Sequence, residues 1–249
     1  GPPGTGKTSL TRAFAREFNI PLCVVESDRL VSALLGDTVK NIRKVVELSA
    51  QIAEENGAFI LFFDEIDAIA SERSNIHEVG EIKRAVISFL QIIDKINYFG
   101  TPLAIIGATN HQDQLDSAIW RRFTFHLKFD FPTFHLRKKI IESFINKISN
   151  AKIGVDEVIL GSLNKEYTLL KSKEEKLRTL VSKEKYLQDL DALWNDKKIL
   201  ENRGILFLTR GYTGADLERG IRVALFKALK ADILTYENFV HSLELVGGT

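Results

Sequence analysis

The chain lacks the features that mark several common classes of protein. Cys23 is the only cysteine among 249 residues, which excludes a disulfide framework and favours a reducing compartment such as the cytoplasm. Cys23 lies in the apolar run 22–25, so we interpret it as a small core residue rather than a nucleophile. No apolar run reaches the roughly 18 residues of a membrane-spanning helix, and no membrane partner is expected.

Neither sign of charge is in excess. The 34 Lys and Arg residues nearly balance the 33 Asp and Glu residues, leaving a net charge of +1. There is no basic stripe interleaved with aromatics, so nucleic acid is not indicated as a partner. The five histidines do not have the spacing of metal ligands. With 45% hydrophobic residues, the chain can bury a core and form one or two domains.

The first nine residues, GPPGTGKTS, fit the pattern G-x-x-x-x-G-K-[ST] of a phosphate-binding loop. Gly4 and Gly6 lack a Cβ atom, so backbone N–H groups can close around phosphate oxygens. Lys7 would meet the β- and γ-phosphates and the Thr8 hydroxyl would hold Mg²⁺. A helix starting near Thr8 would direct its positive end at the same anion. The alternative is a glycine-rich turn that only resembles the motif. We predict that a nucleotide and Mg²⁺ are bound here by Pro3, Gly4, Thr5, Gly6, Lys7, Thr8 and Ser9.

A phosphate-binding loop connects a buried strand to a helix, and no strand precedes Gly1. We therefore expect a further N-terminal part whose strand lies in the middle of the sheet.

Strands and helices are expected to alternate along the first half of the chain, which predicts an α/β fold with a parallel, doubly wound sheet. The unbroken apolar strands are typical of a sheet covered on both faces. The expected helices are 9–18, 28–34, one from 37 onward and 79–94, and the expected strands are 22–25, 59–63 and 103–106.

Residues 123–129 alternate apolar and polar side chains, which predicts a strand at the edge of the sheet. A helix is expected from about Leu136. The region 152–203 that follows is rich in both signs of charge, and we expect it to form helices with solvent-exposed faces. Two more helices follow, one of them 215–230. We predict a nucleotide-binding domain over 1–133 and a helical domain over 134–249.

Acidic residues follow the strand 59–63 directly, where open α/β sheets bind ligands. Asp64 would hold the Mg²⁺ shell, Glu65 would polarise the attacking water, and Asn110 would orient that water or sense the γ-phosphate. The alternative is that Asp64 and Glu65 only cap the next helix. Asp67 is expected to have a structural or subunit-contact role.

Five motifs together resemble the AAA+ ATPases, and their order and spacing fit the AAA branch. The resemblance covers almost the whole chain except the charged region. The motifs are residues 1–8, the acidic strand 59–65, Ala108-Thr109-Asn110, the stretch 115–123 and Gly211-Tyr212-Thr213-Gly214-Ala215-Asp216-Leu217.

The resemblance implies a phosphate-loop NTPase fold followed by a small α-helical lid domain, and a homo-oligomeric ring of six subunits. Lys7, Thr8 and Asp64 would bind ATP and Mg²⁺, Glu65 would be the catalytic carboxylate and Asn110 the first sensor. Arg122, with Arg121 as the second candidate, would be the arginine finger that reaches the nucleotide of the neighbouring subunit. Gly214 and Ala215 would begin the nucleotide-facing helix of the lid.

Two positions depart from patterns seen among relatives. Leu34 stands where many AAA unfoldases have the aromatic residue of a pore loop, although this segment can equally be the end of a core helix. Ala215 stands where other AAA+ branches have a second sensor arginine, which the AAA branch generally lacks as well.

The sequence thus predicts an ATPase that remodels a protein partner. Action on DNA or RNA and a nucleotide-dependent assembly switch with little turnover remain as alternatives.

Overall fold

The computed structural model describes residues 1–26, 37–70, 79–180, 193–229 and 232–248. The chain forms two compact units, Gly1–Phe129 and Asp130–Thr249, and each is described by itself. The predicted helix 28–34 and the candidate pore-loop residue Leu34 lie outside the described residues. In the part of the chain that the structure describes, no helix is both long and apolar enough to cross a bilayer.

A parallel sheet with strand order β1-β2-β3 forms the centre of the first unit. Its strands are β1 (Leu22–Glu26), β2 (Phe59–Asp64) and β3 (Leu103–Gly107). All but the last residue of β2 are buried, as its unbroken apolar run predicted. The parallel pairing confirms the α/β fold and brings the carboxyl ends of the three strands to one edge.

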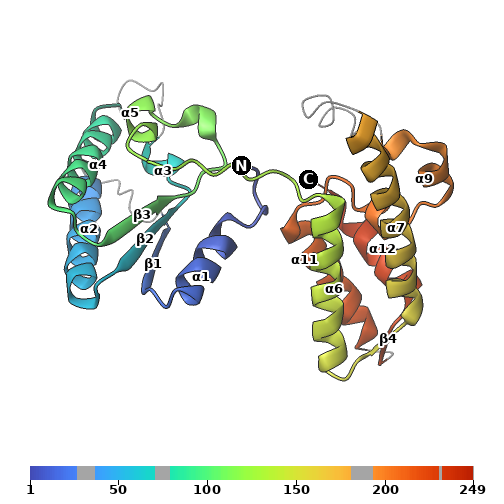
Figure 1. The fold of residues 1–249 in the computed structure, drawn as a ribbon. Coiled ribbons are helices and arrows are strands. Elements are labelled where there is room, and N and C mark those ends of the chain that lie inside the picture. Colours follow the sequence, from blue (N-terminus) through green and yellow to red (C-terminus); the bar gives the residue numbers. More distant parts are fainter. Residues whose placement is uncertain (27–36, 71–78, 181–192, 230–231, 249) are drawn as a thin grey trace. The chain divides into compact units, whose positions relative to one another are not determined.

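Helices cover both faces of this sheet, with α1 on one face and α2 and α4 on the other (Figure 1). The helices of the unit are α1 (Lys7–Glu17), α2 (Asp37–Asn56), α3 (Asp67–Ala70), α4 (Val79–Phe99) and α5 (Ser117–Trp120), with a 3₁₀ turn at Gln112–Gln114.

The core of the first unit forms where α2 and α4 pack on one face of β2. Ile42 and Val46 of α2 are four residues apart and therefore lie on one helix face. They pack with Phe63 of β2 and Phe89 of α4, whose rings meet edge to face at a centroid distance of 5.2 Å.

On α1, Thr11 and Ala15 are buried, whereas the apolar side chains of Leu10, Phe14 and Phe18 are exposed.

The predicted edge strand at 123–129 is wrong, because these residues form no strand in the structure. Phe125 and Leu127 are 85% and 74% exposed. Alternation reports a side-chain pattern, but a strand also needs a neighbour for its backbone hydrogen bonds. Among the described residues no strand lies beside this segment. His126 instead stacks on the ring of Trp120 at 3.9 Å.

The second unit is mainly helical and has its own core. Ile141 and Ile145 of α6 pack against Ile221 of α11 and Phe239 of α12. Its helices are α6 (Phe134–Asn150), α7 (Glu157–Leu180), α9 (Lys197–Glu201), α10 (Ile205–Leu208), α11 (Gly214–Ala228) and α12 (Tyr236–Val246), with a 3₁₀ turn at Leu193–Asn195. Two short strands that the sequence did not predict, β4 (Gly154–Val155) and β5 (Ile233–Leu234), pair in parallel.

Candidate functional site

The glycine-rich loop leads directly into α1. Gly4 and Gly6 have φ angles of 72° and 98°, in the left-handed region where a side chain is disfavoured. Gly6 is the N-cap residue of α1, no side chain caps the helix, and its first turn contains no acidic residue. The N–H groups of that turn, together with the helix dipole, therefore form a suitable environment for an anion.

The Lys7 ammonium is held against the loop and against a neighbouring strand. Its Nζ donates hydrogen bonds to the carbonyl oxygens of Gly1 (2.7 Å) and Pro2 (2.8 Å) and to Asn110 Oδ1 (2.7 Å). Partial burial lowers the pKa of Lys7, while the nearby carboxylates of Asp64, Asp67 and Glu65 act in the opposite direction. Asn110 follows β3, so this contact joins the loop to that strand's carboxyl end.

Thr8 and Asp64 meet beside Lys7. The Thr8 hydroxyl donates to Asp64 Oδ2 at 2.8 Å, and the other carboxylate oxygen accepts from the N–H of Glu65 at 3.2 Å. Asp64 is the last residue of β2, which delivers the carboxylate to the edge of the sheet where α1 begins.

The backbone turns sharply at Glu65, the residue that follows β2. Its φ of 52° lies in the left-handed region, and its side chain is exposed. Such conformations are frequent at functional sites, and neither composition nor periodicity signals one at a glutamate.

The oxygen donors next to the loop fit Mg²⁺. A threonine hydroxyl and a carboxylate are hard ligands, and Mg²⁺ usually combines one or two such protein groups with water and substrate phosphates. Within the described ranges no group of three or more His, Cys, Asp or Glu side chains could hold a metal by itself. Thr8 and Asp64 would therefore share Mg²⁺ with a bound triphosphate.

Arg121 and Arg122 follow α5, whose N-terminus is capped by Asp116 accepting from the N–H of Ala118. Arg122 pairs with Asp94 of α4 through two hydrogen bonds, Nε to Oδ1 at 3.2 Å and NH2 to Oδ2 at 3.3 Å. Arg121 is exposed and forms no ion pair with any residue that the structure describes. Sequence reasoning missed Asp94, because nothing in the sequence brings it close to Arg122.

Gly214 and Ala215 open α11 in the second unit. The helix begins with a capping box, in which Thr213 Oγ1 accepts from the N–H of Asp216 (3.2 Å) and Asp216 Oδ2 accepts from the N–H of Thr213 (2.9 Å). The first turn is therefore rigidly formed, with Ala215 exposed.

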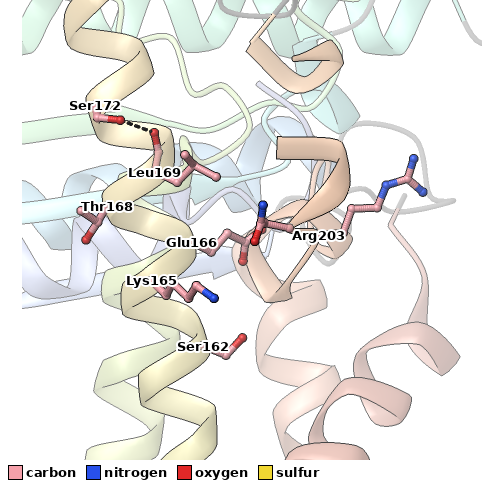
Figure 2. A pocket seen from close by; sticks show the side chains of 8 residues that line it. Ser162, Lys165, Glu166, Thr168, Leu169, Ser172 and Arg203 are labelled. Atoms are coloured by element: carbon pink, nitrogen blue, oxygen red, sulfur yellow. Dashed lines mark hydrogen bonds between the residues drawn. The ribbon is translucent and has the colours of Figure 1, made fainter. Parts of the chain in front are cut away.

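A cavity of about 640 Å³ in the second unit is lined by none of the predicted site residues. Its buried carboxylate, Glu166, points from α7 toward the turn before α10, while Arg203 extends away from α7 (Figure 2). Glu166 already accepts from three backbone N–H groups, those of Gly204, Leu206 and Phe207. This carboxylate therefore holds the start of α10 and is not a candidate catalytic group.

The comparisons with known proteins agree with this architecture. A family model described as "ATPase family associated with various cellular activities (AAA)" matches residues 1–131. The chain is similar to the uncharacterized AAA family ATPase y4kL of Sinorhizobium fredii, with 45% identity over 132 residues that cover 53% of this chain and 38% of that protein. It is also similar to a putative 26S proteasome regulatory subunit homolog of Methanocaldococcus jannaschii, with 33% identity covering 82% of this chain and 54% of that protein.

The mouse ATPase family gene 2 protein homolog B is 32% identical over 80% of this chain and 28% of that protein. The chain thus spans about half or less of the length of these relatives. Among solved structures, the FIGL-1 AAA domain in complex with ADP aligns with a TM-score of 0.65 at 22% identity, covering 100% of this chain and 70% of that one. At that identity the likeness shows the fold. Because the family model covers more than half of the chain, the protein belongs to the AAA family of ATPases.

Proposed function

We propose that this protein hydrolyses ATP with Mg²⁺, assembles into a hexameric ring and uses the hydrolysis to remodel a protein partner. The observation that carries the proposal is the meeting of Lys7, Thr8, Asp64 and Asn110 at one point, through contacts of 2.7 to 2.8 Å. These groups come from the loop and from the ends of two adjacent strands.

Each residue has a role that its position supports. Residues 3–9 would surround the phosphates with N–H groups, and Lys7 would exchange its carbonyl partners for the β- and γ-phosphate oxygens. Thr8 and Asp64 would hold Mg²⁺, which when bound neutralises charge on the triphosphate. Glu65 is exposed next to Asp64, where it would take the proton of the attacking water. Asn110 would orient that water. Gly214 and Ala215, which open α11 of the second unit, would bind the nucleotide as well, a role that rests on the resemblance to the AAA ATPases.

The two arginines are not equivalent, and this favours Arg121 as the group that acts on the neighbouring subunit. Both arginines are exposed, but Arg122 would have to break two hydrogen bonds to Asp94 before it could reach out, whereas Arg121 forms no ion pair with any residue that the structure describes. An arginine supplied in trans stabilises the charge of the transferring phosphoryl group and commonly contributes about 10³-fold or more in rate. A complete site would then need two chains.

A protein is the partner that the chain's chemistry and relatives favour. The balanced net charge of +1 gives no electrostatic footprint for nucleic acid. AAA proteins commonly oligomerise and act on protein substrates, and one relative is named as a proteasome regulatory subunit homolog. The single cysteine suits work in the reducing cytoplasm.

Subunit mixing tests both the chemistry and the ring. Glu65→Gln should bind ATP normally but lose most turnover, and Arg121→Ala should lose about 10³-fold. Mixing the two inactive variants should restore turnover, because a Glu65 from one chain then meets an Arg121 from another. Arg122→Ala is the matched control and should lose less than Arg121→Ala.

Full turnover by Glu65→Gln would refute the catalytic assignment. Turnover per subunit that is independent of protein concentration and insensitive to both arginine substitutions would refute the ring. Stimulation of ATP turnover by an unfolded protein but not by DNA would support a protein partner, and the reverse result would favour nucleic acid.

A further inference from the structure

Asp67 lies outside the groups assigned so far, although it belongs to the acidic stretch 64–67. It is the first residue of α3, and its Oδ1 accepts a hydrogen bond from Thr109 Oγ1 at 2.6 Å. A distance this short is typical of a hydroxyl bound to a charged carboxylate, which is stronger than a hydrogen bond between neutral groups. Asp67 and Thr109 are both partly buried, so water screens this bond less than at the surface.

The Asp67–Thr109 bond continues the pairing between β2 and β3 beyond their ends. The N–H of Ala108 donates to the carbonyl of Phe63, and the N–H of Ile66 donates to the carbonyl of Ala108, both at 2.9 Å. The chain segments that leave the two strands are thus fastened to each other. The side-chain bond from Thr109 to Asp67 is the last of these links.

Thr109 also shapes the turn that carries Asn110. Its Oγ1, while donating to Asp67, accepts from the N–H of His111 at 2.9 Å. The hydroxyl therefore bridges the residues on either side of Asn110, whose Oδ1 reaches Lys7 at 2.7 Å. A rotation of the Thr109 side chain would release both bonds and loosen the turn.

We propose that Asp67 is a positioning residue for ATP hydrolysis, which holds the Thr109 hydroxyl so that Asn110 is presented to the phosphate site. This inference rests on the proposed function, since it concerns the same site. Asp67 makes no hydrogen bond to Lys7 or Thr8 in the described part of the chain and acts on Lys7 through its charge alone. Its hydrogen-bonded link to the phosphate site therefore runs through Thr109 and Asn110. A misplacement of about 1 Å at a catalytic site can cost up to about 10²-fold in rate.

Turnover number and nucleotide affinity, measured separately, test the proposal. Asp67→Ala and Thr109→Val should each lower the turnover number about ten- to a hundredfold. The Kd for a fluorescent ATP analogue should change less than twofold. Thr109→Ser keeps the hydroxyl and should retain most of the turnover. Asp113→Ala removes an exposed carboxylate from the 3₁₀ turn nearby and should match the wild type.

The decisive measurement is made in an Asn110→Ala background. If Asp67 acts through Asn110, adding Asp67→Ala there should lower turnover no further. The proposal would be overturned by any of three results. Asp67→Ala could lower turnover by the same factor in the Asn110→Ala background as in the wild type, Asp67→Ala alone could keep wild-type turnover, or Thr109→Ser could be inactive. The unchanged Kd separates a positioning effect from a folding defect, which would lower binding as well. Glu65→Gln, assayed alongside, reports separately on the proposed function, because its full activity would refute the catalytic assignment whatever Asp67 does.

Discussion

Replacing Glu65 by glycine should make the first unit more stable while it abolishes turnover. Glu65 has a φ of 52°, and its exposed side chain contributes little packing. A residue with a Cβ atom pays about 1–2 kcal/mol for the left-handed conformation, and glycine does not. Against this, glycine has more freedom in the unfolded chain, which costs about 0.4–1 kcal/mol.

Comparing Glu65→Gly with Glu65→Ala isolates the net gain in the free energy of unfolding that comes from the backbone conformation. Both variants lose the carboxylate that acts on Lys7, so this electrostatic change cancels between them. Glu65→Gly should therefore have the larger free energy of unfolding, by about 0.5–1 kcal/mol, or about 2–4 °C in Tm for a unit of this size.

Thermal or urea unfolding measures this difference, and steady-state ATP turnover shows that both variants have lost activity. Lys152→Gly is the matched control outside the site, because Lys152 is an exposed residue with a φ of 63° in the second unit. It should gain stability without losing turnover. A Glu65→Gly variant no more stable than Glu65→Ala would refute the idea that the turn at Glu65 is strained.

Two further predictions concern the second unit. Burial raises the pKa of Glu166 although three backbone N–H groups donate to its carboxylate. The folded state therefore binds a proton at Glu166 more tightly than the unfolded state does. The resulting gain in the free energy of unfolding is complete below about pH 4.5 and is lost as the pH rises through the raised pKa. The free energy of unfolding of the wild type minus that of Glu166→Gln should therefore be larger at pH 4.5 than at pH 7, and a pH-independent difference would contradict this. Removing the buried cap of α11 by Thr213→Ala should cost about 1–2 kcal/mol in chemical unfolding, whereas Thr213→Ser should restore most of it.

Local patterns were sufficient for much of the fold. The apolar run 59–63 predicted a buried strand because a sheet covered on both faces leaves no polar side, and β2 is that strand. The helix expected from residue 37 onward is likewise present as α2. The prediction of an edge strand at 123–129 was wrong because an alternating side-chain pattern cannot supply the neighbouring strand that backbone hydrogen bonding in a sheet requires.

Several features of the site could be found only in three dimensions. The bonds from Asp67 to Thr109 and from Arg122 to Asp94 join residues far apart in the chain, and no local pattern encodes such pairs. The left-handed turn at Glu65 was also hidden, since glutamate is not a residue that signals positive φ.

By itself the sequence determined which candidate groups for phosphate and Mg²⁺ the chain offers, because a glycine-rich loop followed by lysine and threonine, with an aspartate after a buried strand, matches a known phosphate-binding pattern. The tertiary structure decided how these groups meet. Parallel strands bring Asp64 and Asn110 to one edge of the sheet, beside the helix start that carries Lys7 and Thr8. The tertiary structure also decided which neighbouring residues hold these groups in place, since the partner of a side chain depends on packing between segments and not on spacing along the chain.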